Sequence, residues 1–264
     1  MRSLIPEYTN KDSMCTMCIQ AKDKQKFIRF KVKRTLKPFE LVHSDVCSPF
    51  STPTFGGNEH FILFVDDYTR FTFVWMLRDQ KSETCTTTYK SFQARVTTVA
   101  YQIRTFQCDN GQREYDNKTF RSVLTASGTT YEAFPPYSHH TKGVAERMIR
   151  TITEKAQAMT IDPHAPIQFW GEAFNTAVCL HHRSPNEGLK KRDDRNGYKA
   201  PYETSYETLH AFGKPTGNNI SYKAPIHHLR QFGCYVSKLI PKAQRQSKFS
   251  PRSTPCMIVG HTHD

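Results

Sequence analysis

The sequence predicts an α/β fold in which helices pack on a five-stranded sheet, followed by a small C-terminal β extension. Five short runs rich in β-branched and aromatic residues predict the strands, and turn-forming residues follow most of them. Two later segments have apolar residues at helical spacing, which predicts amphipathic helices. With 264 residues, the chain is long enough to bury a substantial core.

The predicted elements follow one another along the first two thirds of the chain. The five predicted strands cover residues 39–45, 60–65, 70–77, 101–108 and 129–134. The second and third should form a hairpin, whereas the first and fourth each bring an aspartate, Asp45 or Asp109, close to a turn. The predicted helices cover residues 82–99 and 117–126, and two more segments that begin at Gly143 and near Pro166. The last two helices should pack on the sheet.

These elements divide the chain into four regions. Residues 1–37 form a basic lead-in, and residues 38–184 contain the predicted sheet and its helices. Residues 185–224 are rich in Lys, Gly, Pro, Asn and Tyr without a sustained period, which predicts a loop or linker. Residues 225–264 regain strand character and predict a small β appendage.

The charge balance is strongly basic. Thirty-seven Lys and Arg residues against 24 Asp and Glu residues give a formal net charge of +13, which favours a polyanionic partner such as nucleic acid. The alternative is an evenly solvated basic surface, because charge alone names no partner. The eight cysteines are mostly isolated in apolar stretches, which predicts reduced thiols. Since the sequence shows neither a membrane-spanning run nor a secretory signal, we expect an intracellular protein without a membrane partner.

Three carboxylates occupy positions that regular elements should hold rigidly. Asp45 lies on the first predicted strand, Asp109 follows the fourth, and Glu146 lies in the first turns of a helix. Mg²⁺ and Mn²⁺ prefer oxygen ligands, and phosphodiester chemistry commonly uses two such ions about 3.5–4 Å apart. Three rigid carboxylates are able to hold such a pair. The alternative is that they act as turn formers and helix caps, which acidic residues at such positions often do.

The residues around these carboxylates resemble those of one known family. His43-Ser-Asp45, Cys108-Asp-Asn-Gly111 and Gly143-Val-Ala-Glu-Arg147 resemble, in order, the motifs of copia-type retrotransposon integrases. The separation of Asp109 from Glu146 is close to the spacing that gives the retroviral-type integrase family its name. The resemblance covers roughly residues 15 to 260, and its further matches are residues 64–71, 228–234, 248–252 and 258–260.

The resemblance implies a fold, an activity and a set of partners. The fold would be a ribonuclease-H-like mixed sheet flanked by helices. The activity would be that of a DDE-type polynucleotidyl transferase, which trims DNA 3′ ends and joins them to a target, with Asp45, Asp109 and Glu146 coordinating two Mg²⁺ or Mn²⁺ ions. The partners would be double-stranded DNA, both element ends and target, and further copies of the chain in a homo-oligomer. The place of action would be the nucleus, with a cytoplasmic particle stage for the whole element.

Further residues have implied binding roles. Lys142, Arg147 and Arg150 lie near Glu146 and are expected to meet DNA phosphates, although helix-surface arginines are often merely solvated. Cys15-x-x-Cys18 resembles the second half of the family's zinc module. Structural zinc needs four ligands, and no histidine precedes Cys15, so the module is expected to be truncated. The two alternatives are a residual zinc site at Cys15 and Cys18 and, as the favoured one, two free thiols.

Two other functions fit the same residues. A catalytically inactive, nucleic-acid-binding remnant of an integrase would keep the fold and the charge but would not turn over. A ribonuclease-H-like nuclease would use the same metal chemistry but would hydrolyse DNA without joining it.

Three histidine pairs and two tryptophans remain outside these roles. The pairs 139–140, 181–182 and 227–228 are expected at polar surface, because neighbouring residues point apart and seldom chelate one ion. Trp75 and Trp170 are expected in the core, because both lie within apolar periodic segments.

Overall fold

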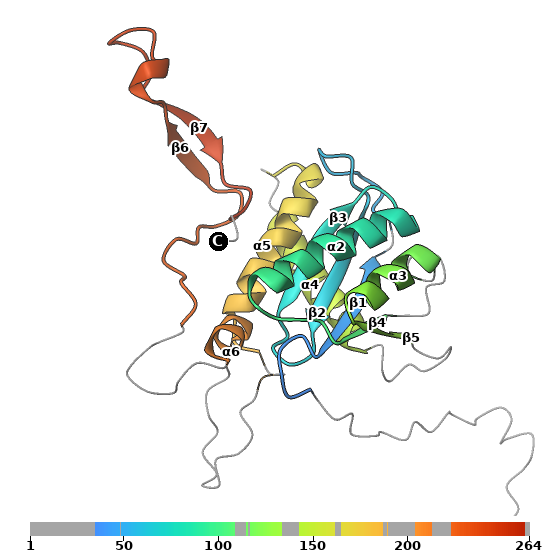
Figure 1. Ribbon diagram of the computed structural model, residues 1–264. Coiled ribbons are helices and arrows are strands. Elements are labelled where there is room, and N and C mark those ends of the chain that lie inside the picture. Colours follow the sequence, from blue (N-terminus) through green and yellow to red (C-terminus); the bar gives the residue numbers. More distant parts are fainter. Residues whose placement is uncertain are drawn as a thin grey trace, which may run out of the picture. The chain divides into compact units, whose positions relative to one another are not determined.

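The computed structural model describes residues 35–47, 49–108, 115, 117–133, 143–161, 165–186, 189, 204–212 and 223–261. Within them, helices lie on both faces of a central sheet, and a two-stranded hairpin follows later in the chain (Figure 1). No helix in this part of the chain has the length and apolar character needed to cross a membrane.

The central sheet has five strands in the order β3-β2-β1-β4-β5. The strands are β1 (Leu41–Cys47), β2 (His60–Asp66), β3 (Thr72–Leu77), β4 (Thr105–Cys108) and β5 (Thr130–Ala133). The pairs β1–β2 and β2–β3 are antiparallel, whereas β1–β4 and β4–β5 are parallel. The prediction of a five-stranded mixed sheet is therefore confirmed.

Helices cover the sheet on both faces, which explains why β2 is buried along its whole length and is apolar from residue 61 to residue 65. Alternate residues of β2 enter two separate core clusters, because successive side chains point to opposite faces. On one face lie α2 (Ser82–Thr98) and α3 (Lys118–Ala126), which enclose the first core cluster. In this cluster the ring of Phe64 stacks on that of Phe92 at a centroid distance of 4.4 Å. On the other face lie α4 (Gly143–Thr160) and α5 (Trp170–Arg183), which enclose the second core cluster.

The predicted helices and strands are observed with shifted ends. The first strand runs two residues beyond Asp45, to Cys47. The fourth begins at Thr105 rather than at residue 101, because Ala100 leaves α2 in the left-handed region (φ 62°) and the next residues bring the chain back to the sheet. Trp170 is buried as expected, and Trp75 packs half-buried against the first core cluster.

Helix α5 corrects the expectation that its histidine pair lies at polar surface. His181 and His182 are both buried, at 8% and 3% exposure. The Nε2 atom of His182 lies 3.0 Å from the amide nitrogen of Thr72 and 2.8 Å from its carbonyl oxygen, and the imidazole ring stacks on Phe71 at 3.6 Å. The two histidines are buried because α5 packs against β3, α4 and α6 and so has little free surface. The pair 227–228 is exposed, as expected, and the pair 139–140 lies outside the described residues.

The region after α5 contains more regular structure than the sequence predicts. Helix α6 (Ser205–Ala211) lies within residues 185–224, where we expected a loop or linker, so that expectation is corrected here. Its N-terminus is fixed by a capping box, in which Thr204 and Glu207 each accept a hydrogen bond from the other's backbone amide.

The expected β appendage is an antiparallel hairpin of β6 (Tyr235–Leu239) and β7 (Ser253–Met257). At its base, Phe232 is buried in the second core cluster, and Met257 and Val259 pack against that cluster. The hairpin is therefore joined to the core by apolar contacts at one end.

Candidate active site

Asp45 lies on the central strand of the sheet, on the face that α4 covers. In the antiparallel register Asp45 pairs with Leu63, and Leu63 belongs to the core cluster that contains Met148 and Ile152 of α4. Residues paired in register point to the same face, so the side chain of Asp45 lies on the α4 side. It is half-buried, and its Oδ1 accepts a hydrogen bond of 2.9 Å from the amide of Val46.

Glu146 lies in the first turn of α4 and is exposed. The buried stripe of this helix is Ala145, Met148, Ile152 and Ala156. Through this stripe α4 packs on β1 and β2. Asp45 and Glu146 are therefore held on the same side of the sheet by elements that contact each other.

Asp109 itself lies outside the described residues, and the structure describes only its neighbour in the chain. Cys108, the last residue of β4, pairs in parallel register with Ser44 on β1. The residues that follow Cys108 and Ser44 in the sequence are Asp109 and Asp45, respectively. Cys108 is fully buried, so the end of β4 is well fixed.

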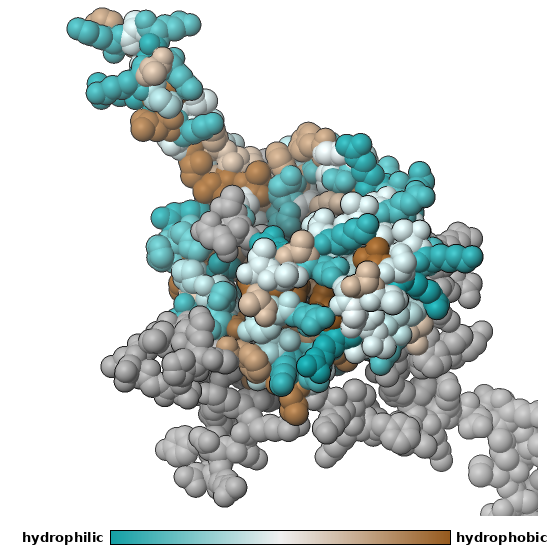
Figure 2. Space-filling model, in the orientation of Figure 1, coloured by the Kyte–Doolittle hydropathy of each residue, from teal (hydrophilic) through white to brown (hydrophobic). Residues whose placement is uncertain are grey.

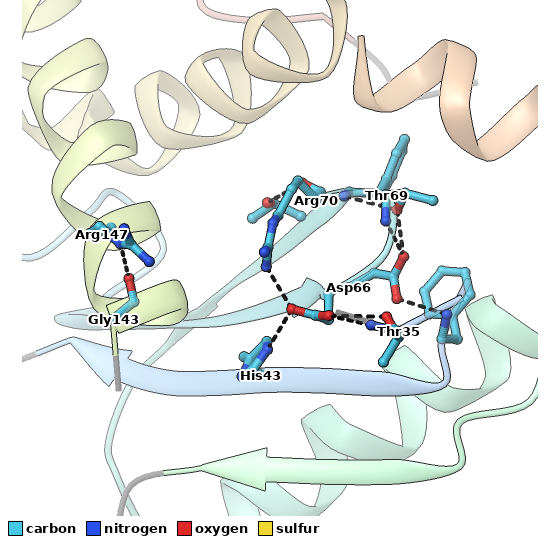
Figure 3. A network of polar contacts seen from close by, with 11 residues as sticks. Thr35, His43, Asp66, Thr69, Arg70, Gly143 and Arg147 are labelled. Atoms are coloured by element: carbon cyan, nitrogen blue, oxygen red, sulfur yellow. Dashed lines mark hydrogen bonds and ion pairs between the residues drawn. The ribbon is translucent and has the colours of Figure 1, made fainter. Parts of the chain in front are cut away.

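A network of buried carboxylates lies at the other end of β1. Asp67, just after β2, accepts hydrogen bonds from His43 Nε2 at 3.2 Å and Arg70 Nη1 at 2.9 Å. Its second oxygen accepts from the amide and hydroxyl of Thr35, at 3.1 and 3.0 Å. His43, Arg70 and Thr35 thus converge from three segments of the chain (Figure 3). Because His43 and Asp45 are two residues apart on β1, this network helps to fix the strand that carries Asp45.

The two adjacent aspartates of this network have opposite pKa shifts. Burial raises the pKa of Asp66, although the hydroxyl and amide of Thr69 and the amide of Phe39 donate to it. Burial also acts to raise the pKa of Asp67, but the hydrogen bond from His43 and the positive charge of Arg70 outweigh it and hold that pKa well below its usual range. Asp67 is therefore an ionised, paired carboxylate with a structural position.

Comparison with known sequences identifies the family. Residues 35–139 match the integrase core domain family, a match that includes Asp45 and Asp109 and ends before Glu146. The chain is 32% identical over 250 residues to the retrovirus-related Pol polyprotein from transposon TNT 1-94 of Nicotiana tabacum, which covers 94% of this chain. The chain belongs to the retrotransposon integrase family.

Other relatives of this integrase chain are longer polyproteins. The transposon Ty1-LR3 Gag-Pol polyprotein of Saccharomyces cerevisiae is 24% identical over 209 residues, or 77% of this chain. The integrase chain spans only 17% of the tobacco polyprotein and 12% of the yeast one. It therefore corresponds to one segment of such polyproteins.

A solved structure agrees on the fold. The integrase chain is similar to a chain of the simian T-cell lymphotropic virus intasome in complex with the PP2A regulatory subunit B56 gamma, with a TM-score of 0.56 and 16% identity. The match covers 91% of this chain and 76% of the other. Together with the mixed five-stranded sheet, it shows the ribonuclease-H-like fold of integrase catalytic cores, as the sequence predicts.

The described residues of the integrase core fit a divalent metal in their chemistry. Asp45 and Glu146 both offer carboxylate oxygens, which Mg²⁺ and Mn²⁺ prefer, and neither is sealed from solvent. Among the residues that the structure describes, no group of three or more His, Cys, Asp or Glu side chains is close enough to hold an ion. The third expected ligand, Asp109, is outside that set, as are Cys15 and Cys18 of the predicted zinc remnant.

Two of the three expected phosphate contacts lie on the same helix as Glu146. Arg147 and Arg150 are exposed on α4, and Lys142 lies outside the described residues. The guanidinium Nε of Arg147 donates to the carbonyl oxygen of Gly143, which holds this side chain along the first turn of the helix (Figure 3). Arg150 is one turn beyond Glu146, on the same side of α4.

Sequence reasoning did not identify the network around Asp67. The Asp66-Asp67 pair is visible in the sequence only as the end of a strand. The signal that points to more is an adjacent acidic pair directly after an apolar run of five residues, because carboxylates this close to a core need internal partners.

Proposed function

We propose that this chain is the catalytic core of an active integrase, which carries out metal-dependent 3′-end processing and strand transfer on double-stranded DNA. The observation that carries the proposal is the placement of its acidic residues. Asp45 lies on the α4 face of β1, Glu146 lies at the start of α4, and the parallel register of β1 with β4 ends at the residues that precede Asp45 and Asp109. The family to which the chain belongs supports the same reaction class.

In the proposed site, Asp45, Asp109 and Glu146 would hold two Mg²⁺ or Mn²⁺ ions. When bound, such ions supply an activated attacking oxygen and stabilise the leaving oxygen of an in-line displacement at phosphorus. The role of the chain is to hold the three carboxylates in place, with β1 and α4 supplying rigid positions. Lys142, Arg147 and Arg150 orient the DNA through its phosphates.

The partners and location follow from this proposal. The substrates are element ends and target DNA, and the net charge of +13 suits both. A homo-oligomer is the proposed active form, and the nucleus, with a cytoplasmic particle stage, the proposed location. A multimeric form is in keeping with the solved structure that contains a chain of similar fold, which is named as an intasome in complex with a further protein.

A strand-transfer assay tests the proposal. Purified protein, a labelled blunt duplex that carries element ends and Mn²⁺ should give products longer than the substrate. Asp45→Asn and Glu146→Gln should remove them, because each deletes a metal ligand. Glu154→Gln is the matched control, since Glu154 is an exposed acid on the same helix, two turns further on. All three variants should keep the melting temperature of the wild type within about 2 °C, since none of the three side chains is fully buried and each substitution keeps the size of the side chain.

The other functions give different results in the same assay. Shortened products alone would indicate a nuclease that does not join DNA. Salt-sensitive binding without any product would indicate an inactive nucleic-acid-binding remnant. Equal products from the wild type and Glu146→Gln would refute the assignment of Glu146.

A further inference from the structure

A buried hydrogen bond lies directly behind the strand that carries Asp45. The hydroxyl oxygens of Ser44 and Tyr115 are 2.8 Å apart, and the two residues are buried, at 2% and 3% exposure. Ser44 precedes Asp45 on β1, and successive side chains of a strand point to opposite faces. The register agrees, since Ser44 pairs with Phe64 of the first core cluster. The hydrogen bond therefore contacts β1 from the face opposite to Asp45.

The ring of Tyr115 is part of the core, whereas its hydroxyl makes a specific contact. The ring packs against Phe106 of β4 and Phe120 of α3, at centroid distances of 5.5 and 5.3 Å. Figure 2 shows a mostly hydrophilic or neutral outer surface over α2 and α3, as expected for helices whose apolar side faces this cluster. A phenylalanine would fill the same space, so what the hydroxyl adds is the contact with Ser44. Burial holds the pKa of Tyr115 well above its ordinary value, so the phenol keeps its proton in this contact.

Ser44 is joined to both ends of the segment that contains Asp109. Cys108, the last residue of β4, is fully buried and pairs with Ser44 in parallel register. Tyr115 is joined to Ser44 by the hydrogen bond. Residues 109–114 thus connect two buried residues that share one partner, and this partner is the neighbour of Asp45 in the sequence.

We propose that Ser44 and Tyr115 are positioning residues for the carboxylate site. Their hydrogen bond fixes the spacing between the segments that carry Asp45 and Asp109, and through this spacing it sets the affinity of the site for a divalent cation. Ligands that hold two ions about 3.5–4 Å apart need such support, because an arrangement about 1 Å too loose loses its function. The inference rests on the proposed function in taking the two aspartates as metal ligands.

Mn²⁺ binding by the full chain tests this role without any reaction. Free Mn²⁺ gives a paramagnetic resonance signal that is lost on binding, so a titration with MnCl₂ yields the dissociation constant. Tyr115→Phe and Ser44→Ala should each raise this constant about tenfold, the lower end of what loss of an outer-shell partner costs. The double variant should also raise it about tenfold, because the two hydroxyls share one bond. A loss of about a hundredfold in the double variant would mean independent effects and would overturn the proposal.

Tyr89→Phe is the matched control. The ring of Tyr89 also packs against Phe106 and Phe120, at 5.2 and 5.3 Å, and its hydroxyl lies 3.5 Å from that of Thr129. This variant removes the same atom from the same cluster, but not beside Ser44, and should change the dissociation constant by less than about twofold. Equal constants for Tyr115→Phe and Tyr89→Phe would overturn the proposal.

The strand-transfer assay separates positioning from a general loss of structure. Tyr115→Phe should need about tenfold more Mn²⁺ for half of its maximal rate and should keep at least about half of the wild-type rate at saturating Mn²⁺. Partial unfolding would instead lower the rate at every Mn²⁺ concentration, together with the circular dichroism signal. A lower maximal rate with unchanged Mn²⁺ dependence would therefore count against the positioning role.

The two proposals can fail separately. Mn²⁺ binding that weakens with Tyr115→Phe but supports no strand transfer would reject the catalytic proposal and keep the positioning role. Strand transfer that depends on Asp45, with equal Mn²⁺ binding by the wild type and Tyr115→Phe, would do the reverse. Equal Mn²⁺ binding by the wild type and Asp45→Asn would reject both.

Discussion

Replacing Asp67 by asparagine should destabilise the whole sheet, because one carboxylate joins three segments. One oxygen accepts from His43 and Arg70 and the other from Thr35, over distances of 2.9 to 3.2 Å. An asparagine has no charge and keeps only one acceptor oxygen. Its amide NH2 group replaces the other oxygen, so this donor would face the two groups that donate to that oxygen in the wild type. Hydrogen bonds to a charged group contribute about 1.5–3 kcal/mol each, and breaking a buried ion pair costs about 3–5 kcal/mol.

We therefore expect Asp67→Asn to lower the free energy of unfolding by about 3 kcal/mol. For a chain of this size that corresponds to a melting temperature lower by roughly 6–12 °C. Thermal and urea unfolding at pH 7 measure it. Glu154→Gln makes the same change of charge at an exposed position and should shift stability by no more than about 0.5 kcal/mol.

The effect should also depend on pH. Because the pKa of Asp67 is lowered in the folded state, its contribution is present above the unfolded value, near 3.9, and is lost as the pH falls towards the folded value. The difference between wild type and Asp67→Asn should thus be constant from about pH 5 to 8 and shrink below about pH 4. A difference that persists undiminished at about pH 3, or an Asp67→Asn variant as stable as Glu154→Gln, would refute this reasoning.

Three further substitutions have expected outcomes. Burial, and then the charge of Lys155, lowers the pKa of His181 to about 4, so between there and about pH 6.5 the unfolded chain binds a proton that the folded chain does not. The wild type should lose about 1.4 kcal/mol of stability per pH unit on acidification through this range, and His181→Leu should reduce that slope in urea unfolding; equal slopes would contradict the assignment. Ile152→Ala empties a fully buried position on α4 and should cost about 2–5 kcal/mol, whereas Ile161→Ala, at 78% exposure, should cost less than about 0.5 kcal/mol. Thr204→Ala removes the capping box of α6 and should cost about 1 kcal/mol, seen as faster amide hydrogen exchange in α6 with exchange in α4 unchanged.

The sheet and its covering helices could be predicted because local pattern and tertiary environment agree there. The wholly apolar run of β2 is what a strand covered on both faces requires. The fourth-residue spacing of Met148, Ile152 and Ala156 matches the buried side of α4. For the same reason the positions of Asp45 and Glu146 on regular elements could be predicted, although their roles as metal ligands stay predictions.

What the sequence did not predict depends on contacts between distant segments. His181 and His182 are polar residues, which predicts exposure, but α5 packs on several elements at once and encloses both. The ion pair of Asp67 with Arg70 is local, yet its partners His43 and Thr35 come from 24 and 32 residues away. The helix α6 is the opposite case, because its Thr204–Glu207 capping pattern is visible locally but stands in a segment without helical period.

The position of His182 has a consequence for the exposed edge of the sheet. Strand β3 is the last strand on its side of the sheet, and the peptide groups of such a strand are open to any passing extended chain. At Thr72 the imidazole of His182 already occupies the place where a foreign strand would pair, and Phe71 closes over its ring. A side chain from helix α5 of the same chain therefore covers the backbone of the edge strand at this residue, which disfavours pairing with another strand there.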